Sequence, residues 1–148
     1  MTTDRIEKQI VLKAPQSRVW RAIANSEEFG TWFQIKFDGP FVPGASLKGQ
    51  ITHPGYEDWG GDFDVERVEP ERLFSFRWHP YAKPGIDYSG EPKTLVEFIL
   101  EPVEGGTHLT IIESGFDQIP LARREEAFRM NEGGWTGQLK NIERYVTA

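Results

Sequence analysis

The chain has 148 residues, no cysteine and a formal net charge of −6, from 17 basic and 23 acidic side chains. This length predicts one domain, residues 1–148, with a substantial core, and the missing cysteines exclude disulfides, thiol nucleophiles and cysteine-ligated metals. The negative charge argues against nucleic acid or an anionic membrane as a partner. The sequence also has no apolar stretch of membrane-spanning length and no signal-peptide pattern, so we expect a cytoplasmic protein.

The N-terminal part predicts one strand followed by two short helices. The segment "RIEKQIVLK" places Ile6, Ile10 and Leu12 on one parity, which indicates a strand. Pro15 stands where a helix begins. The next segment, "SEEFGTWF", predicts a second helix with Ser26 as its N-cap and Gly30 breaking it.

The middle of the chain has the alternation typical of β-strands. Strands are predicted in "SLKGQIT", "GDFDVERVE", "RLFSFRW", "TLVEFILEP" and "GGTHLTIIES", the last two joined by a Gly-Gly hairpin turn. Five consecutive strands of this kind predict an antiparallel meander. Between the third and fourth lies a long loop, residues 79–93, with three prolines. Loops of this length are often lids or binding loops.

The C-terminal segment predicts a long amphipathic helix that contains an unusual run of glycines. Trp135, Leu139, Ile142 and Val146 recur on one helical face. Gly133, Gly134 and Gly137 interrupt this pattern, and each glycine inside a helix costs about 1 kcal/mol relative to alanine. Either the glycines kink the helix and open an entrance beside Trp135, or they mark a junction between two helices with Asn131 as a cap.

The predicted fold class is therefore α+β. Its element order is β-α-α-β-β-β-β-β-α, a curved antiparallel sheet of about six strands around a long C-terminal helix.

Several segments resemble a known superfamily. The opening "I.L.APQSRVWRAIAN....F..WF", the pieces "FVPGASLKG" and "VERVEPERLFSFRW", the hairpin "TLVEFILEPVEGGTHLTIIESGF" and the closing "GGWTGQLKNIERYV" are similar to the START/birch-pollen-allergen-like helix-grip (SRPBCC) superfamily. Within it they resemble homologues of the activator of the ninety-kilodalton heat-shock protein ATPase. The resemblance covers nearly the whole chain and implies the helix-grip fold. Such proteins bind hydrophobic small molecules, cyclise polyketides or act as co-chaperones, and the fold alone does not choose among these functions.

The aromatic side chains predicted to face inward supply a candidate binding site. The expected ligand-binding residues are Trp32, Phe33, Phe63, Phe74, Phe76, Trp78, Phe98, Met130, Trp135 and Leu139, with Trp59, His79, Tyr81 and Tyr88 at the rim. These rings either line a cavity between sheet and helix or simply fill the core.

Motifs for other chemistry are missing from the sequence. Its three histidines are far apart and lack metal-ligand spacing, and there is no nucleophile elbow or phosphate loop, so we predict no metal, no cofactor and no catalytic residue. The acidic cluster Glu57, Asp58, Asp62 and Asp64 is interpreted as a solvated surface. Arg77 and Glu97 are expected to face outward; either would become a candidate for orienting a ligand if it faced inward.

Three functions remain open. The first is binding of a small hydrophobic molecule, aromatic or lipid-like, between the sheet and the C-terminal helix. The second is a co-chaperone-like module that contacts a heat-shock chaperone, which requires a large exposed apolar patch. The third is a polyketide cyclase-like enzyme, which requires a buried ionisable group with a shifted pKa.

Overall fold

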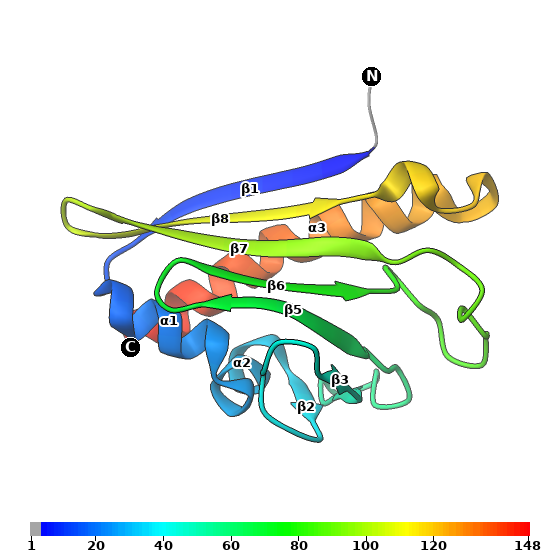
Figure 1. Ribbon diagram of the computed structural model, residues 1–148, viewed down its shortest axis with the longest axis horizontal. Coiled ribbons are helices and arrows are strands. Elements are labelled where there is room, and N and C mark those ends of the chain that lie inside the picture. Colours follow the sequence, from blue (N-terminus) through cyan, green and yellow to red (C-terminus); the bar gives the residue numbers. More distant parts are fainter. Residues whose placement is uncertain (1–3) are drawn as a thin grey trace.

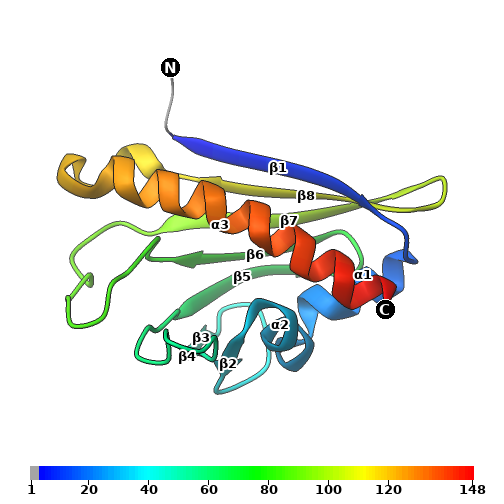
Figure 2. The ribbon, with the colours of Figure 1, turned by 180° about the vertical axis from the view of Figure 1, so that it is seen from behind.

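The computed structural model describes residues 4–148. A twisted sheet forms one layer and the helices lie against one of its faces (Figures 1 and 2). The elements in chain order are β1 (Arg5–Leu12), α1 (Gln16–Ala24), α2 (Ser26–Phe33), β2 (Ile35–Phe37), β3 (Ser46–Leu47), β4 (Gly49–Ile51), β5 (Phe63–Glu69), β6 (Leu73–Trp78), β7 (Thr94–Val103), β8 (Gly106–Ser114), a 3-10 turn (Phe116–Gln118) and α3 (Leu121–Thr147).

The main sheet has six antiparallel strands in the order β1-β8-β7-β6-β5-β3, so the predicted meander is confirmed and the N-terminal strand completes it beside the last. The predicted strand over residues 46–52 divides after Leu47. Its first part pairs with β5, whereas β4 pairs with β2 in a separate two-stranded sheet. The strand β2 was not predicted, because three residues are too few to show an alternating pattern.

The tight turn between β7 and β8 falls one residue earlier than the glycine pair suggests. Val103 pairs with Gly106, so Glu104 and Gly105 form the turn. Gly105 has a φ of +84°, which favours glycine. Gly106 begins β8, and a Cβ atom there would lie 2.0 Å from the carbonyl oxygen of Leu12. The two glycines therefore serve different needs, one conformational and one of space.

The two short helices pack at one end of the sheet. The predicted N-cap of α2 is wrong: the side chain of Asn25, not Ser26, accepts hydrogen bonds from the backbone N–H groups of Glu27 and Glu28, at 3.0 and 2.9 Å. Gly30 does not break α2 either. It lies inside the helix, where a Cβ atom would be 2.2 Å from the carbonyl oxygen of Ile35. Helix α2 ends at Phe33, and Gln34 takes the left-handed conformation.

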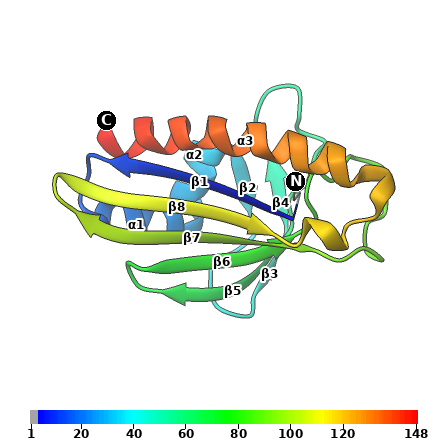
Figure 3. The ribbon, with the colours of Figure 1, turned by 90° about the horizontal axis from the view of Figure 1, so that it is seen from above.

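The long helix α3 runs along one face of the sheet from one end to the other; it lies in front of the sheet in Figure 2 and above it in Figure 3. It is continuous through Gly133, Gly134 and Gly137. Its buried positions, apart from Ala127, are the four predicted from the helical pattern: Trp135, Leu139, Ile142 and Val146. The helix-grip architecture expected from the sequence is thereby confirmed.

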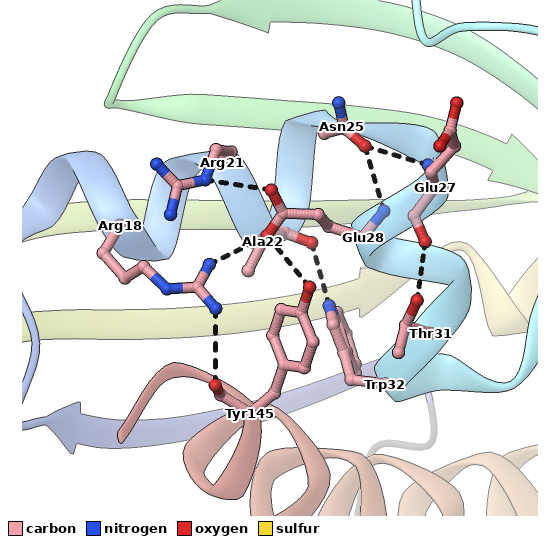
Figure 4. Close-up of polar contacts among 9 residues, drawn as sticks. All are labelled: Arg18, Arg21, Ala22, Asn25, Glu27, Glu28, Thr31, Trp32 and Tyr145. Carbon is pink, nitrogen blue, oxygen red and sulfur yellow. Dashed lines mark hydrogen bonds and ion pairs between the residues drawn. The ribbon is translucent and has the colours of Figure 1, made fainter. Parts of the chain in front are cut away.

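A polar network fixes the C-terminal end of α3 against α1 and α2 (Figure 4). Glu28 accepts hydrogen bonds from Arg18, Arg21 and Tyr145, at 2.8, 2.9 and 3.0 Å. The Arg18 guanidinium lies over the Tyr145 ring, 4.8 Å from its centroid. Burial would raise the pKa of Glu28, but the hydrogen bonds from Arg18 and Tyr145 and the positive charges of Arg18 and Arg21 together outweigh burial and lower it. The network therefore holds the three helices in one arrangement over the sheet.

Candidate functional site

A small pocket of about 70 Å³ opens between α3, the end of α2 and the end of β6. Its lining residues are Phe33, Trp78, Asn131, Gly134, Trp135 and Gln138. Pockets that enclose whole drug-sized ligands measure about 300–1,000 Å³. This pocket therefore has room for one small group, and the rest of a larger ligand would lie outside it.

A fully buried carboxylate lies behind two of the pocket walls. Glu113, on β8, is 0 % exposed. The indole N–H of Trp135 donates to its Oε1 and that of Trp78 to its Oε2, each at 2.8 Å. Thr94 donates to Oε2 at 2.6 Å, and the Asn131 amide donates to Oε1 at 2.9 Å. Four side chains from β6, β7 and α3 thus converge on one carboxyl group.

Strand register explains this convergence. Trp78 pairs with Thr94 across β6 and β7, and Val96, two residues further on the same face, pairs with Glu113 across β7 and β8. All of these side chains therefore share the concave face at one end of the sheet. On the helix, Asn131 and Trp135 are four residues apart and so point the same way.

Burial raises the pKa of the Glu113 carboxyl, whereas hydrogen bonds from Thr94, Trp135, Trp78 and Asn131 oppose the rise. All four partners are uncharged side chains. The group is thus fully hydrogen-bonded, yet none of these partners carries a compensating positive charge.

The structure brings three of the sequence-predicted ligand residues together at the pocket. The ring centroids of Phe33, Trp78 and Trp135 are separated by 6.3 Å (Phe33 to Trp78), 6.1 Å (Phe33 to Trp135) and 5.8 Å (Trp78 to Trp135). Trp135 is 2 % exposed, and Phe33 and Trp78 are half-buried. The three rings form the apolar wall of the pocket.

Most of the other predicted ligand residues pack against one another in the core. Phe63 and Phe76 stack with centroids 3.7 Å apart, and Phe74 lies 4.7 Å from Phe41. The buried members of this group are Trp32, Phe63, Phe74, Phe76, Phe98 and Leu139. Trp32 is also anchored by its indole N–H, which donates to the carbonyl of Ala22 at 2.8 Å. Side chains thus fill much of the space between sheet and helix.

Met130 and the predicted rim residues lie away from the pocket lining. Met130 is 43 % exposed, because Ala127, Asn131 and Trp135 occupy the inward positions of α3 at this level. Trp59 and Tyr81 contact each other with centroids 5.5 Å apart, and His79 lies 6.1 Å from Tyr88. His79 and Tyr88 line a separate surface hollow of about 380 Å³ in the 79–93 loop region.

The glycines of α3 do not divide the helix, which is continuous from Leu121 to Thr147. A Cβ atom built on Gly133, Gly134 or Gly137 meets no described atom within 4 Å, so none of them makes room for a packed neighbour. Gly134 differs from the other two because it lines the pocket. The absence of a side chain there keeps the mouth of the pocket open.

The remaining polar residues take surface roles. Arg77 forms an ion pair with Glu66 on the exposed side of the sheet. Glu97 pairs with Ser75, which is two residues from Arg77, so Glu97 lies on the same side of the sheet as Arg77. Asp64, in the acidic segment, pairs with Lys93. Among residues 4–148, no cluster of three or more histidine and acidic side chains is arranged to hold a metal ion. Within the same range, no helix is both long and apolar enough to cross a membrane.

Sequence reasoning missed Glu113 and the role of Asn131. The signal for Glu113 was present, since Leu109 and Ile111 point inward and Glu113 continues their parity. Asn131 has no comparable signal. The sequence allowed it to be a helix cap, whereas it lies inside the continuous helix and donates to Glu113.

Solved structures of the same fold include several bacterial proteins. Protein MLL2253 from Mesorhizobium loti is 22 % identical, with a TM-score of 0.77 and coverage of 97 % of this chain and 96 % of that one. The Aha1 dimer from Colwellia psychrerythraea is 19 % identical, with a TM-score of 0.73 and coverage of 99 % and 96 %. DynU16, described as a putative protein in the dynemicin biosynthetic locus, is 23 % identical, with a TM-score of 0.76; the match covers 98 % of this chain and 48 % of DynU16.

These identities establish a common fold and no more. No curated protein matches the chain significantly. The model of one protein family, described as activator of Hsp90 ATPase homolog 1-like protein, matches residues 13–147. This match agrees with the resemblance drawn from the sequence motifs and with the helix-grip fold. The chain therefore belongs to the activator of Hsp90 ATPase homolog 1-like family.

Proposed function

We propose that this domain binds a small, largely apolar molecule, aromatic or lipid-like, one group of which enters the pocket between the sheet and α3. The observation that carries this proposal is the ring triangle of Phe33, Trp78 and Trp135 around an open pocket. Aromatic walls with a few fixed polar groups are typical of ligand sites. Here the polar groups in the lining are the amides of Asn131 and Gln138.

The hydrogen bonds to Glu113 support the proposal because they fix two of the three rings. Each indole N–H is held at 2.8 Å by the same carboxylate. Rotation of either ring would leave a buried donor or acceptor unpaired, which costs about 1–3 kcal/mol. The walls are therefore preorganised, and a ligand spends little free energy on ordering them.

The same hydrogen bonds favour binding over catalysis by Glu113. Its two oxygens accept from four side chains and the residue is 0 % exposed, so it faces its own partners and not the solvent. A general acid or base must reach the proton that it transfers.

The test is intrinsic tryptophan fluorescence and thermal shift against flavonoids, fatty acids, sterols and polyketide fragments. We expect a binding ligand to quench the emission of Trp78 and Trp135 and to raise the melting temperature. The Gly134→Leu variant would place a side chain at the pocket mouth and abolish the response. Gly137→Leu is the matched control, because it makes the same change on the exposed face one turn away. If both variants still bind the ligand, the proposed location is refuted.

A further inference from the structure

The unusual feature of this site is a buried acid to which residues 4–148 supply only neutral hydrogen-bond donors. Glu113 is 0 % exposed, and its hydrogen-bond donors Trp78, Thr94, Asn131 and Trp135 are all neutral. Elsewhere in residues 4–148, less buried acids such as Glu28, Asp64 and Glu91 each pair with an arginine or lysine. Burial of a carboxylate without a cation is unfavourable, and a nearby positive charge would relieve it.

The pocket beside Glu113 is suited to a positive charge. Its three rings form a nearly equilateral triangle with centroid separations of 5.8–6.3 Å. A point above the middle of such a triangle lies within about 6 Å of all three centroids, the distance at which a cation over the face of an aromatic ring is attracted to it. Both indole rings donate their N–H groups to Glu113, which increases the electron density of the rings and so strengthens that attraction.

The remaining lining sets the kind of cation. The described lining residues other than the rings are Asn131, Gly134 and Gln138, so no lysine or arginine repels a cation and no carboxylate accepts hydrogen bonds from one. A primary ammonium would lose hydration without finding enough acceptors. An alkylated ammonium has few or no N–H groups to satisfy, and it offers an apolar surface to the rings. The volume of about 70 Å³ suits such a compact head group.

We propose that the pocket receives the alkylated ammonium group of a cationic ligand, held between the ring triangle of Phe33, Trp78 and Trp135 and the buried carboxylate of Glu113. This inference rests on the proposed function, because it names the chemical class of the group that enters the same pocket. The net charge of −6 would also favour the approach of a cation.

The experiment compares choline with 3,3-dimethylbutan-1-ol, a probe of nearly the same shape in which a neutral carbon replaces the charged nitrogen. Binding is measured by tryptophan fluorescence and calorimetry at low ionic strength. We expect choline to bind the wild-type protein at least about ten-fold more tightly than the neutral alcohol, which corresponds to the strength of a partly desolvated cation–π contact.

Three variants locate the preference. Gly134→Leu should abolish binding of both probes, and Gly137→Leu should leave both unchanged. Phe33→Leu keeps the wall apolar, removes one ring and leaves the hydrogen bonds to Glu113 intact, so it should reduce the ratio of the two affinities several-fold while the alcohol still binds. Because Phe33 lies outside the Glu113 network, this variant is expected to fold, which a melting curve verifies.

The outcomes separate this inference from the proposed function. If the neutral alcohol binds as tightly as choline, the ammonium preference is refuted and the apolar site stands. If choline remains preferred with full affinity in Gly134→Leu, the cation binds elsewhere and the inference is wrong. If neither probe binds the wild-type protein but an uncharged compound of the wider panel does, the inference fails alone. If nothing binds, both proposals fail.

Discussion

The indole N–H of Trp135 donates to Oε1 of Glu113 at 2.8 Å, and this hydrogen bond joins the middle of α3 to the concave face of the sheet. Trp135 is the largest side chain that α3 buries, and Glu113 is 0 % exposed. The bond therefore forms where water does not compete for either group. It ties the middle of the helix to one buried acidic residue, while the Glu28 network holds its C-terminal end.

Replacing Glu113 is expected to destabilise the protein. In Glu113→Gln one of the two acceptor oxygens becomes an NH₂ group, which can only donate. The single remaining oxygen then faces three N–H donors, the indoles of Trp78 and Trp135 and the amide of Asn131. At least one buried N–H loses its acceptor, which costs about 1–3 kcal/mol. Urea denaturation monitored by circular dichroism measures the loss. The control is Glu97→Gln on the other parity of β7, for which we expect a change within about 0.5 kcal/mol.

The stability difference between the wild-type protein and Glu113→Gln should also depend on pH. Burial raises the pKa of Glu113 above its ordinary value of 4.5, so the folded state binds a proton more readily than the unfolded chain. The stability contributed by that proton is complete below the unfolded pKa and is lost as pH rises through the folded pKa. The wild-type protein should therefore lose stability relative to Glu113→Gln as pH rises from 4.5 through the raised pKa of Glu113. A constant difference across that range would show that the carboxyl titrates normally.

The fold was largely predictable because its signals are periodic. The alternation of Phe74, Phe76 and Trp78 and the helical spacing of Trp135, Leu139, Ile142 and Val146 each specify one buried face, and the structure buries those faces. The site was less predictable, because its polar part interrupts the apolar pattern. Glu113 occupies an inward position at which a carboxylate is unexpected, and only the three-dimensional arrangement supplies its four donors. Whether the rings enclose a cavity also depends on packing distances, which a sequence does not contain.

The glycines of α3 provide a prediction about helix stability. A Cβ atom at Gly133 or Gly137 meets no described atom within 4 Å, so alanine fits at both positions. Each substitution should stabilise the protein by about 1 kcal/mol, the difference in helix propensity. Gly30→Ala is the contrasting control inside α2. Its Cβ atom would lie 2.2 Å from the carbonyl oxygen of Ile35, so this substitution should destabilise the protein. Thermal unfolding of the three variants measures both effects, and a lower melting temperature for Gly137→Ala would contradict the prediction.

The network in Figure 4 leads to a further prediction about the end of α3. Tyr145→Phe removes the hydroxyl that donates to Glu28 at 3.0 Å but keeps the ring beneath Arg18. We expect a loss of about 1 kcal/mol or less, because the side chains of the network are partly exposed to solvent. Since the pKa of Glu28 is lowered, the loss should be present at neutral pH and disappear as pH falls through that pKa. Equal losses at neutral and acidic pH would mean that the hydroxyl acts independently of the Glu28 charge.

The long loop between β6 and β7 contacts α3 through Arg123 and through a more exposed ion pair between Lys83 and Glu126. Arg123 donates to Glu91 at 2.8 Å and to the carbonyl of Pro80 at 2.9 Å, and it lies over the Tyr88 ring at 4.5 Å from the centroid. Its side chain is 17 % exposed, so these contacts are partly shielded from water. Arg123→Met should therefore release the loop while the sheet core remains intact.

Hydrogen exchange followed by mass spectrometry would measure this release. We expect faster exchange in residues 79–93 of Arg123→Met and unchanged exchange in the peptides that contain Phe74, Phe98 and Ile111, which are fully buried. Arg129→Met is the matched control, because Arg129 is an exposed arginine on the same helix that lines the groove beside β1 instead. Trp78 and Thr94 stand at the two ends of the loop and both bond to Glu113, and Lys83 pairs with Glu126 of α3. Unchanged exchange in Arg123→Met would mean that these other contacts suffice to hold the loop in place.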